Sequence, residues 1–236
     1  EHLRREEYYK YSDFAILYRT NAQSRAFEDV LMREGIPYKV VGGQKFYERK
    51  EIKDIIAYLR LVQNTNDDVS LKRIINEPKR GIGKTSLDAV EQAARQTGKS
   101  MFDIIKDADK YVTTRANTAF KEFANFILKM REDTSSVEKL TSNILDGSGY
   151  IKALEDEKTE EAEGRIENLG QFINVAIEFE EQYAENGLPE FLENLALVTD
   201  LDNVDEEQDQ MLLMTLHTAK GLEFPVVFLV GMEEGI

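Results

Sequence analysis

The chain has no cysteine and only two histidines among its 236 residues. The absence of cysteine excludes disulfide scaffolds, thiolate zinc sites and cysteine nucleophiles, and it fits a reducing compartment. His2 and His217 alone argue against a multi-histidine metal site and against an internal histidine relay. No apolar run reaches the roughly 20 residues needed to cross a bilayer. We therefore expect a soluble, cytoplasmic α/β or α protein with no metal site and no membrane partner.

Basic side chains are in the minority, at 30 against 45 acidic ones, for a net charge of −15. The two signs are also unevenly spread, because residues 1–100 carry a net +4 and residues 101–236 a net −19. A nucleic acid would therefore have to dock on a local basic surface, drawn mainly from the first hundred residues. Apolar residues recur regularly through the acidic half, which favours solvated helix faces over an acidic tail.

Three nearly unbroken apolar runs predict strands, at residues 14–18, 211–216 and 226–230. Unbroken rather than alternating runs are typical of strands covered on both faces, which predicts a mainly parallel sheet. A fourth run, at residues 38–41, is weaker. Between the first run and the fourth, we expect Asn21 to cap a helix that continues to about Glu34 and ends at Gly35.

The middle of the chain has helical spacing instead, and residues 54–204 predict six to eight amphipathic helices and no strand. The acidic stretch 200–210 is unpatterned and is interpreted as a loop. The predicted fold is α/β plus all-α. A partial parallel-sheet domain (1–53 and 205–236) is interrupted by a large helical insertion (54–204). A sheet of three or four strands is small for independent stability, so we also expect a fragment of a longer protein.

The segment RGIGKTS (80–86) contains Gly-Lys-Thr, the end of a phosphate-binding P-loop. The full pattern requires a glycine where Pro78 stands and a strand just before the loop, but the preceding residues have helical spacing. The dinucleotide-binding pattern also fails, because Ser86 occupies its third glycine position. ATP binding at this loop is therefore rejected.

The same segment is better explained as a glycine hairpin between a helix over residues 69–76 and a second helix starting near Thr85, with Asp88 completing a variant capping box. Gly81 and Gly83 allow the backbone to approach a phosphate, and the amides of a helix N-terminus point toward it. An ordinary glycine corner is about equally plausible. Nearby cationic side chains favour contact with a DNA backbone: Lys79, Arg80 and Lys84.

Three more polar segments are candidates for binding. Residues 18–25, with Arg19 and Asn21, follow the first strand, where open α/β sheets bind ligands; a helix cap with solvated arginines is the favoured alternative. Residues 215–224 form a polar loop between apolar strands, although His217 alone is more often structural. Residues 42–54 interleave aromatic and basic side chains, which suits single-stranded DNA or a junction. An amphipathic helix start with exposed lysines explains that last segment equally well.

Four segments together resemble the UvrD/Rep/PcrA family of superfamily 1 DNA helicases, and within it most resemble the bacterial PcrA proteins. YRTNAQSR (18–25) resembles motif IV, and GGQKFYERKEIKDIIAYLRL (42–61) resembles the start of the family's helical insertion. KRGIG (79–83) resembles the insertion's duplex-contacting glycine motif, and MTLHTAKGLEFPVVFLVGMEEG (214–235) resembles motif V. The segments occur in the family's order. The motif V block is highly specific, whereas KRGIG alone is not.

The resemblance implies part of the second RecA-like domain of an ATP-dependent 3′–5′ DNA helicase that works in DNA repair and replication. It implies ATP and Mg²⁺ in the full-length protein, with single-stranded DNA and a single/double-strand junction as partners, and it names no protein partner. Glu223 would approach the nucleotide. The residues that would contact single-stranded DNA are Arg19, Asn21, Thr215, His217 and Thr218. Those that would contact duplex DNA are Lys53, Arg80, Gly81, Ile82, Gly83 and Thr85.

The chain departs from the family by lacking a Walker A loop, a Walker B motif for Mg²⁺, and the later arginine motif. Phosphoryl transfer needs these parts positioned together. We therefore expect no catalytic residue in this chain, no bound cofactor and no ATP hydrolysis without the missing first RecA-like domain. Two other readings remain: a stand-alone duplex-binding module built on the glycine hairpin, and a protein-interaction domain that uses the acidic helices.

Overall fold

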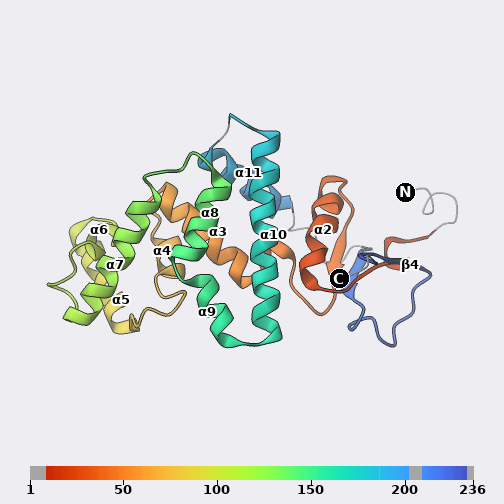
Figure 1. Cartoon of the computed structure of the whole chain (residues 1–236), viewed down its shortest axis with the longest axis horizontal. Coiled ribbons are helices and arrows are strands. Elements are labelled where there is room, and N and C mark those ends of the chain that lie inside the picture. Colours follow the sequence, from red (N-terminus) through yellow and green to blue (C-terminus); the bar gives the residue numbers. More distant parts are fainter. Residues whose placement is uncertain (1–8, 186, 202–208, 233–236) are drawn as a thin grey trace. The chain divides into compact units, whose positions relative to one another are not determined.

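The computed structural model of the protein describes residues 9–185, 187–201 and 209–232. The chain divides into two compact units (Figure 1). The sheet unit comprises residues 1–49 and 195–236, and the helical unit comprises residues 50–194. The sequence placed the divisions near residues 53 and 204. The first division lies at residue 49 because helix α3 (Lys50–Gln63) already begins at Lys50.

The sheet unit contains four parallel strands: β1 (Phe14–Tyr18), β2 (Tyr38–Val40), β3 (Met211–Thr215) and β4 (Val226–Leu229). Their order across the sheet is β2-β3-β1-β4. Leu17 in β1 pairs with Met214 on one side and with Leu229 on the other. All four predicted strands and their parallel direction are therefore confirmed, and segments from the two ends of the chain share one sheet.

Helix α2 (Ser24–Arg33) follows β1 and packs Leu31 into a core with Ile16, Tyr38 and Leu213. The predicted β-α-β unit and the end of its helix are confirmed, since Gly35 adopts a φ of +63° just after α2. The predicted cap is wrong. A short 3-10 helix, η2 (Asn21–Gln23), precedes α2, and the side chain of Gln23 accepts hydrogen bonds from the Arg19 and Thr20 amides.

Strand β4 differs from the prediction of burial on both faces. Its residues Val227, Phe228 and Leu229 are 48%, 44% and 45% exposed. Both β2 and β4 lie at edges of the sheet, but Tyr38 and Val40 of β2 share a core with Leu31 of α2, whereas the side chains of β4 are less covered by the described residues. Phe228 still stacks on Phe14 of β1, with the ring centroids 6.4 Å apart.

The rest of the described chain is helical. The helices are α3, α4 (Asp68–Ile74), α5 (Lys84–Thr97), α6 (Met101–Ile105), α7 (Thr114–Met130), α8 (Val137–Gly147), α9 (Tyr150–Glu157), α10 (Glu160–Gln182) and α11 (Leu188–Leu201). These nine helices of the described part exceed the six to eight predicted, because pieces as short as α6 have too few residues to show a clear period. Most of the predicted acidic loop at 200–210 lies outside the described residues.

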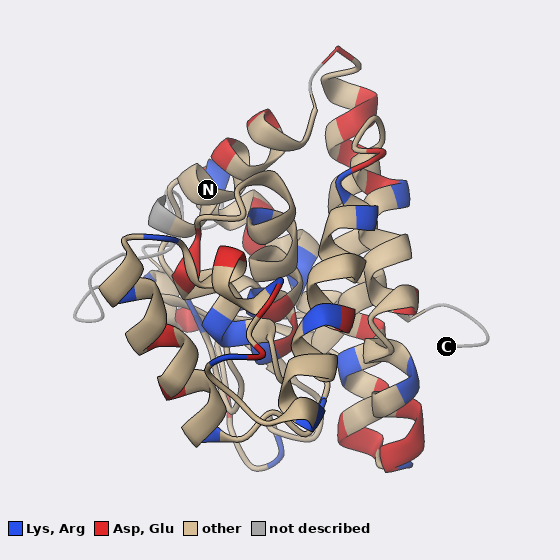
Figure 2. Cartoon of the chain, turned by 90° about the vertical axis from the view of Figure 1, so that its left-hand side faces the viewer, with Lys and Arg blue, Asp and Glu red and all other residues tan. Residues whose placement is uncertain are grey.

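Acidic and basic side chains are mixed over the helical unit. Figure 2 shows Lys and Arg segments among the Asp and Glu segments on the helices that face the viewer. Examples of the pairing are Lys72 with Glu91, at 2.8 Å, and Lys121 with Asp107, at 2.9 Å. Local ion pairs therefore partly compensate the negative charge of the helical unit. Within the described residues, no helix has the length and apolar character that crossing a membrane requires.

Candidate nucleic-acid interface

The carboxyl edge of the sheet gathers several of the predicted residues. Because all four strands are parallel, the loops after them leave from the same edge. Thr215 and Thr218 lie there, with their hydroxyl oxygens 2.9 Å apart, and the Thr218 amide donates to the Thr215 hydroxyl at 3.2 Å. Gly42, in the loop after β2, has a φ of +75°, and a Cβ there would come within 3.0 Å of the Thr218 side chain. The loops after β2 and β3 are therefore in close contact.

Arg19 and Asn21 follow β1 at this same edge, and His217 follows β3; all three are exposed. In the part of the chain that the structure describes, the side chains of Arg19 and His217 have no hydrogen-bond or ion-pair partner. Asn21 neighbours the loop after β2, since its side-chain oxygen lies 3.8 Å from where a Cβ of Gly43 would stand. A cation, an imidazole and hydroxyl groups are thus available at one edge of the sheet. This combination suits contacts to a phosphate backbone.

Glu223 is exposed but does not belong to this group. It lies three residues before β4, and the first residue of β4 pairs with Phe14 at the amino end of β1. The loop after β3 therefore carries His217 at the carboxyl edge and Glu223 on its return to the opposite edge. Within the described residues no cluster of three or more acidic or histidine side chains could hold a metal ion.

The structure contradicts the DNA-binding interpretation of the segment 42–54, because three of its residues are not available to a nucleic acid. Phe46, Tyr47 and Arg49 are buried, with exposures of 0%, 4% and 6%. The Arg49 guanidinium donates to the Ser24 hydroxyl at 2.7 Å and lies 3.5 Å from the Glu28 carboxylate. These contacts join the segment to α2 within the sheet unit.

Glu28 is the centre of this buried cluster, at 1% exposure. It accepts hydrogen bonds from the Ser24 hydroxyl at 2.5 Å, the Phe46 amide at 2.9 Å and the Tyr38 hydroxyl at 3.2 Å. Burial, together with the negative charge of Glu28, raises the pKa of Tyr18 to about 12. The cluster fixes the start of α2, which follows directly from the loop that carries Arg19 and Asn21.

In the helical unit, the predicted glycine hairpin connects α4 and α5 and is held by Asn76 and Arg80. The side-chain oxygen of Asn76 accepts hydrogen bonds from the backbone amides of Arg80 at 2.8 Å and Ile82 at 3.4 Å. The Arg80 guanidinium donates to three backbone oxygens around the end of α4, namely those of Ile74, Ile75 and Pro78. It also donates to the Tyr58 hydroxyl at 2.7 Å and lies over the Phe123 ring at 5.0 Å.

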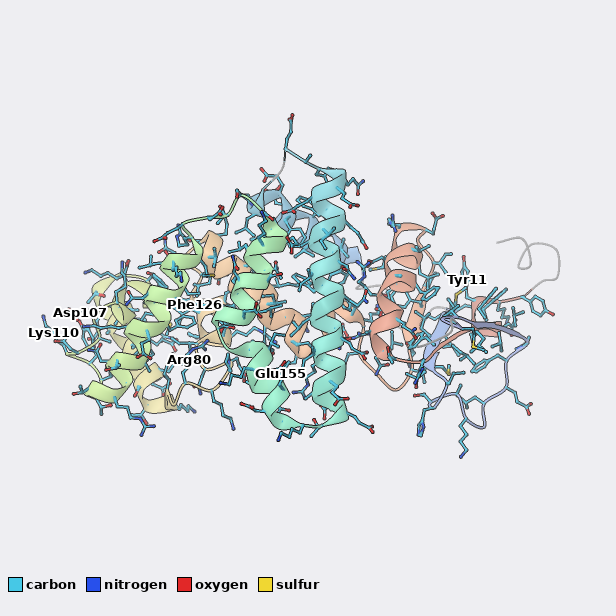
Figure 3. The ribbon with its side chains drawn as sticks, in the orientation of Figure 1. Tyr11, Arg80, Asp107, Lys110, Phe126 and Glu155 are labelled. Atoms are coloured by element: carbon cyan, nitrogen blue, oxygen red, sulfur yellow. The ribbon has the colours of Figure 1, made fainter. Side chains whose placement is uncertain are left out.

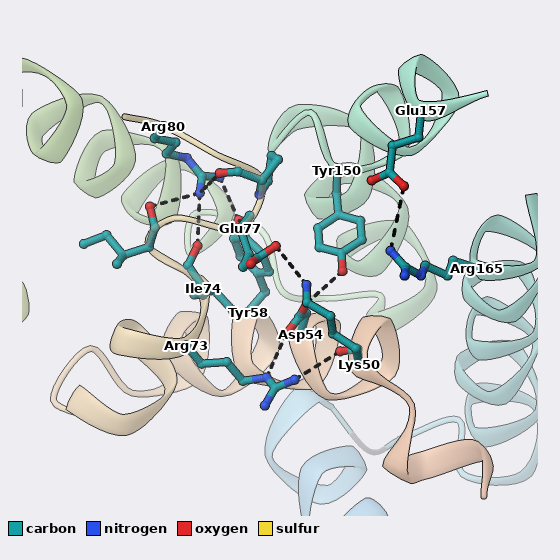
Figure 4. A network of polar contacts seen from close by, with 12 residues as sticks. Lys50, Asp54, Tyr58, Arg73, Ile74, Glu77, Arg80, Tyr150, Glu157 and Arg165 are labelled. Carbon is teal, nitrogen blue, oxygen red and sulfur yellow. Dashed lines mark hydrogen bonds and ion pairs between the residues drawn. The ribbon is translucent and has the colours of Figure 1, made fainter. Parts of the chain in front are cut away.

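A network of polar contacts continues from the hairpin to α3 (Figure 4). Tyr58 donates to the backbone oxygen of Glu77 at 2.6 Å, and the Glu77 carboxylate pairs with Lys50 at 2.8 Å. Lys50 also pairs with the buried Asp54 at 2.9 Å. Burial alone would lower the pKa of Lys50, but the hydrogen bonds and charges of these two carboxylates raise it overall.

Asp54 has two more partners, which bring α4 and α9 into the same network. Arg73 lies 2.8 Å from its carboxylate, and the Tyr150 hydroxyl donates to it at 2.7 Å. Burial and the charge of Asp54 together raise the pKa of Tyr150. The base of the hairpin is therefore connected to three helices of the helical unit.

The first turn of α5 is uncapped by any side chain. Gly83 is its N-cap, with extended backbone angles, and a Cβ at that position would meet no atom within 4 Å. Thr85 is already the second residue of the helix, two positions after the N-cap, so the predicted capping box with Asp88 is wrong. Five helices of the same unit have a side-chain cap instead: α4 (Asp67), α6 (Ser100), α7 (Thr113), α8 (Ser136) and α10 (Thr159). In the described structure, the Lys84 and Thr85 amides have no acceptor.

The remaining duplex candidates fall into two groups. Gly81, Gly83, Thr85 and, on α3, Lys53 are exposed, whereas Ile82 is 5% exposed and anchors the hairpin. Arg80 is partly buried and borders a cavity of about 260 Å³ with Phe123 and Phe126. Figure 3 shows Arg80 and Phe126 in the same region of the helical unit. The structure thus gives Arg80 internal contacts where the sequence predicted a contact to DNA.

Sequence reasoning missed Asn76, Tyr58 and Asp54. Asn76 is close to the hairpin in sequence, and an asparagine before a proline and a glycine turn is a usable signal for a side chain that organises a loop. Tyr58 and Asp54 are buried polar residues inside the apolar pattern of α3. A polar residue on a buried helix face indicates a specific partner, although the pattern cannot name it.

Comparisons with known proteins give one consistent result. Residues 1–236 match the family described as UvrD-like helicase C-terminal domain. The chain is 48% identical over 236 residues to the ATP-dependent DNA helicase PcrA of Bacillus subtilis (strain 168). It is 47% identical to the PcrA of Staphylococcus aureus (strain Mu50) and 46% identical to that of Staphylococcus epidermidis. In each case 96% of the chain aligns with 32% of the relative, so the chain spans about a third of the curated relatives it matches.

Proposed function

The chain belongs to the UvrD-like helicase C-terminal domain family, and we propose that it is the DNA-contacting part of an ATP-dependent 3′–5′ DNA helicase. In this proposal the sheet unit is part of the second RecA-like domain and the helical unit is its insertion. The observation that carries it is the convergence of Arg19, Asn21, Thr215 and Thr218 at one edge of a parallel sheet. Those residues come from the two blocks that resemble motifs IV and V.

The two units would have different DNA substrates. The carboxyl edge of the sheet would contact the backbone of single-stranded DNA through Arg19, His217 and the Thr215–Thr218 pair. The hairpin would contact duplex DNA through the free amides at the start of α5, with Lys84 adding positive charge. Such contacts recognise a phosphate backbone without reading base sequence. A single/double-strand junction would occupy both surfaces.

ATP and Mg²⁺ would bind only in the longer protein, with a first RecA-like domain supplying the phosphate loop. Glu223 is the one residue of this chain proposed to approach the nucleotide. No phosphate-binding loop follows any of the described strands, and the Gly-Lys-Thr sequence follows helix α4 instead. No step of ATP hydrolysis is therefore assigned to side chains of this chain.

Two assays test the proposal. The purified chain, incubated with Mg-ATP and single-stranded DNA, is expected to release no phosphate above a mock purification. The same chain should bind a duplex with a single-stranded tail more tightly than either part alone, and log affinity should fall linearly with log salt concentration. ATP turnover by the chain would refute the non-catalytic role.

The same binding assay separates the two other readings. A stand-alone duplex module predicts that His217→Ala leaves single-strand binding unchanged. A protein-interaction domain that uses acidic helices predicts no salt-dependent DNA binding. The helicase assignment predicts a loss in the first case and a steep salt dependence in the second.

A further inference from the structure

Two arginines lie beside the glycine hairpin, and their surroundings differ. Arg80 belongs to the hairpin itself, but its guanidinium donates four hydrogen bonds within the helical unit and lies over the Phe123 ring. A guanidinium has only five N–H donors. Nη1, which has two of them, makes three of these contacts and Nη2 makes the fourth, so most of the Arg80 donors hold the hairpin, and the side chain is partly buried.

Arg115 reaches the hairpin from another helix. It lies in the first turn of α7, and its Nη2 atom is 3.6 Å from where a Cβ of Gly81 would stand. Arg115 is exposed, and it has no hydrogen bond or ion pair with any residue that the structure describes. The absence of a side chain at Gly81 leaves room for the guanidinium next to the hairpin backbone.

The position of Arg115 has no evident benefit for folding. A cation in the first turn of a helix meets the positive end of the helix dipole, which is slightly destabilising. The cap of α7 is provided by Thr113, whose hydroxyl accepts from the Ala116 amide, so Arg115 is not needed there. Arg115 is thus a cation in an electrostatically unfavourable place, beside Gly81 of the hairpin that leads into the amides without acceptors at the start of α5, and such a combination suits an anion.

We propose that Arg115 is a direct duplex-phosphate contact, completing on α7 the surface formed by Gly81, Gly83 and the first turn of α5. Arg80 holds the hairpin in position from inside and does not contact the phosphate. This inference rests on the proposed duplex contact of the hairpin. It adds a residue 34 positions away in sequence, outside every segment that resembled a helicase motif.

The test measures duplex affinity against salt concentration for the 236-residue chain, by fluorescence anisotropy with a labelled blunt duplex. Arg115→Gln should weaken binding about tenfold at low salt, the size expected for one charged hydrogen bond. It should also reduce the slope of log affinity against log salt by about 0.9, because one phosphate contact is lost. Its thermal midpoint should stay the same or rise slightly.

Two other variants serve as controls. Lys129→Gln removes one positive charge from the exposed last turn of the same helix and should change neither affinity nor slope by a comparable amount. Arg80→Gln should lower the thermal midpoint and the affinity but leave the salt slope unchanged, because no phosphate contact is lost.

The outcomes distinguish this inference from the proposed function. If Gly83→Asp abolishes duplex binding while Arg115→Gln keeps the wild-type affinity and slope, Arg115 is not a contact and only the inference fails. If the wild-type chain does not bind duplex, or binds it equally well as Gly83→Asp, the proposed hairpin contact fails together with the inference. An equal loss in Lys129→Gln would show a general charge effect and would also overturn the role of Arg115.

Discussion

Glu28 in the sheet unit and Asp54 in the helical unit are both buried carboxylates that pair with cations, and their partners differ in exposure. Glu28 in the sheet unit pairs with Arg49, and the side chains of both are nearly inaccessible, at 1% and 8% exposure. Asp54 in the helical unit is equally buried, but its partners Lys50 and Arg73 are 50% and 37% exposed. One cluster is closed to solvent, and the other reaches the surface.

This difference separates structural cations from available ones. In the sheet unit the buried Arg49 holds the start of α2 through Ser24 and Glu28. The exposed Arg19 and His217 are the groups that remain available to a ligand. In the helical unit a single network links α3, α4, α9 and the hairpin, and the Lys84 and Thr85 amides that follow the hairpin have no acceptor within the described structure. A basic residue that is close to the hairpin in sequence is therefore not necessarily available for a DNA contact.

The largest expected effect is on the closed cluster. Glu28→Gln removes the charge partner of a buried arginine and should lower the stability of the sheet unit by about 3 kcal/mol, as breaking a buried ion pair usually does. Urea unfolding followed by circular dichroism measures it. Glu34→Gln, on an exposed residue just after α2, is the control and should change stability by less than about 0.5 kcal/mol.

A smaller effect is expected for the open cluster. Asp54→Asn should lower the stability of the helical unit by about 2 kcal/mol, because Lys50 and Arg73 can be hydrated once their partner is neutral whereas the buried Tyr150 keeps an acceptor. The same unfolding experiment applies, with the exposed Asp88→Asn as the control. A loss in this variant larger than that of Glu28→Gln would contradict the contrast between the two clusters.

Gly83→Asp separates binding from stability. An aspartate at this N-cap should accept the free amides itself, raising the stability by a few tenths of a kcal/mol. The same carboxylate should repel phosphate and occupy its donors, so duplex affinity should fall at least about tenfold, by anisotropy. Gly170→Asp adds the same charge at an exposed position on α10 and should bind normally. Unchanged duplex binding by Gly83→Asp would remove the role of the α5 amides.

The smallest effect is expected at the carboxyl edge of the sheet. His217→Ala should weaken single-strand binding about threefold, since one exposed contact of several is lost. Duplex affinity, measured in the same series, is the internal control and should not change. Equal losses for both DNA forms would indicate one shared surface and would break the division between the two units.

The strands were predictable because their signal is local. The apolar runs at 14–18 and 211–216 each identify a strand without reference to any other part of the chain, and parallel pairing follows from their unbroken character. The exposed face of β4 could not be predicted, because an apolar run says nothing about a strand's position in the sheet. The extra helices escaped prediction for a similar local reason, since α6 has only five residues.

The candidate site was predictable in part. The hairpin was recognised from Gly81 and Gly83, but the roles of its neighbours depend on contacts distant in sequence. Arg80 meets Tyr58 22 positions away, and Gly81 meets Arg115 34 positions away. Whether an arginine is buried or free is set by such tertiary contacts, so a count of basic residues near a motif could not distinguish Arg80 from Arg115.

The division of DNA contacts between two units is tested most directly by an NMR titration of the ¹⁵N-labelled chain with two oligonucleotides, a blunt duplex and a single strand. The duplex is expected to shift the amide signals of Gly83, Lys84 and Thr85, whereas the single strand is expected to shift those around Arg19 and Thr218. If both DNA forms shift the same signals, or if the amides of α5 do not respond to duplex, the account is contradicted.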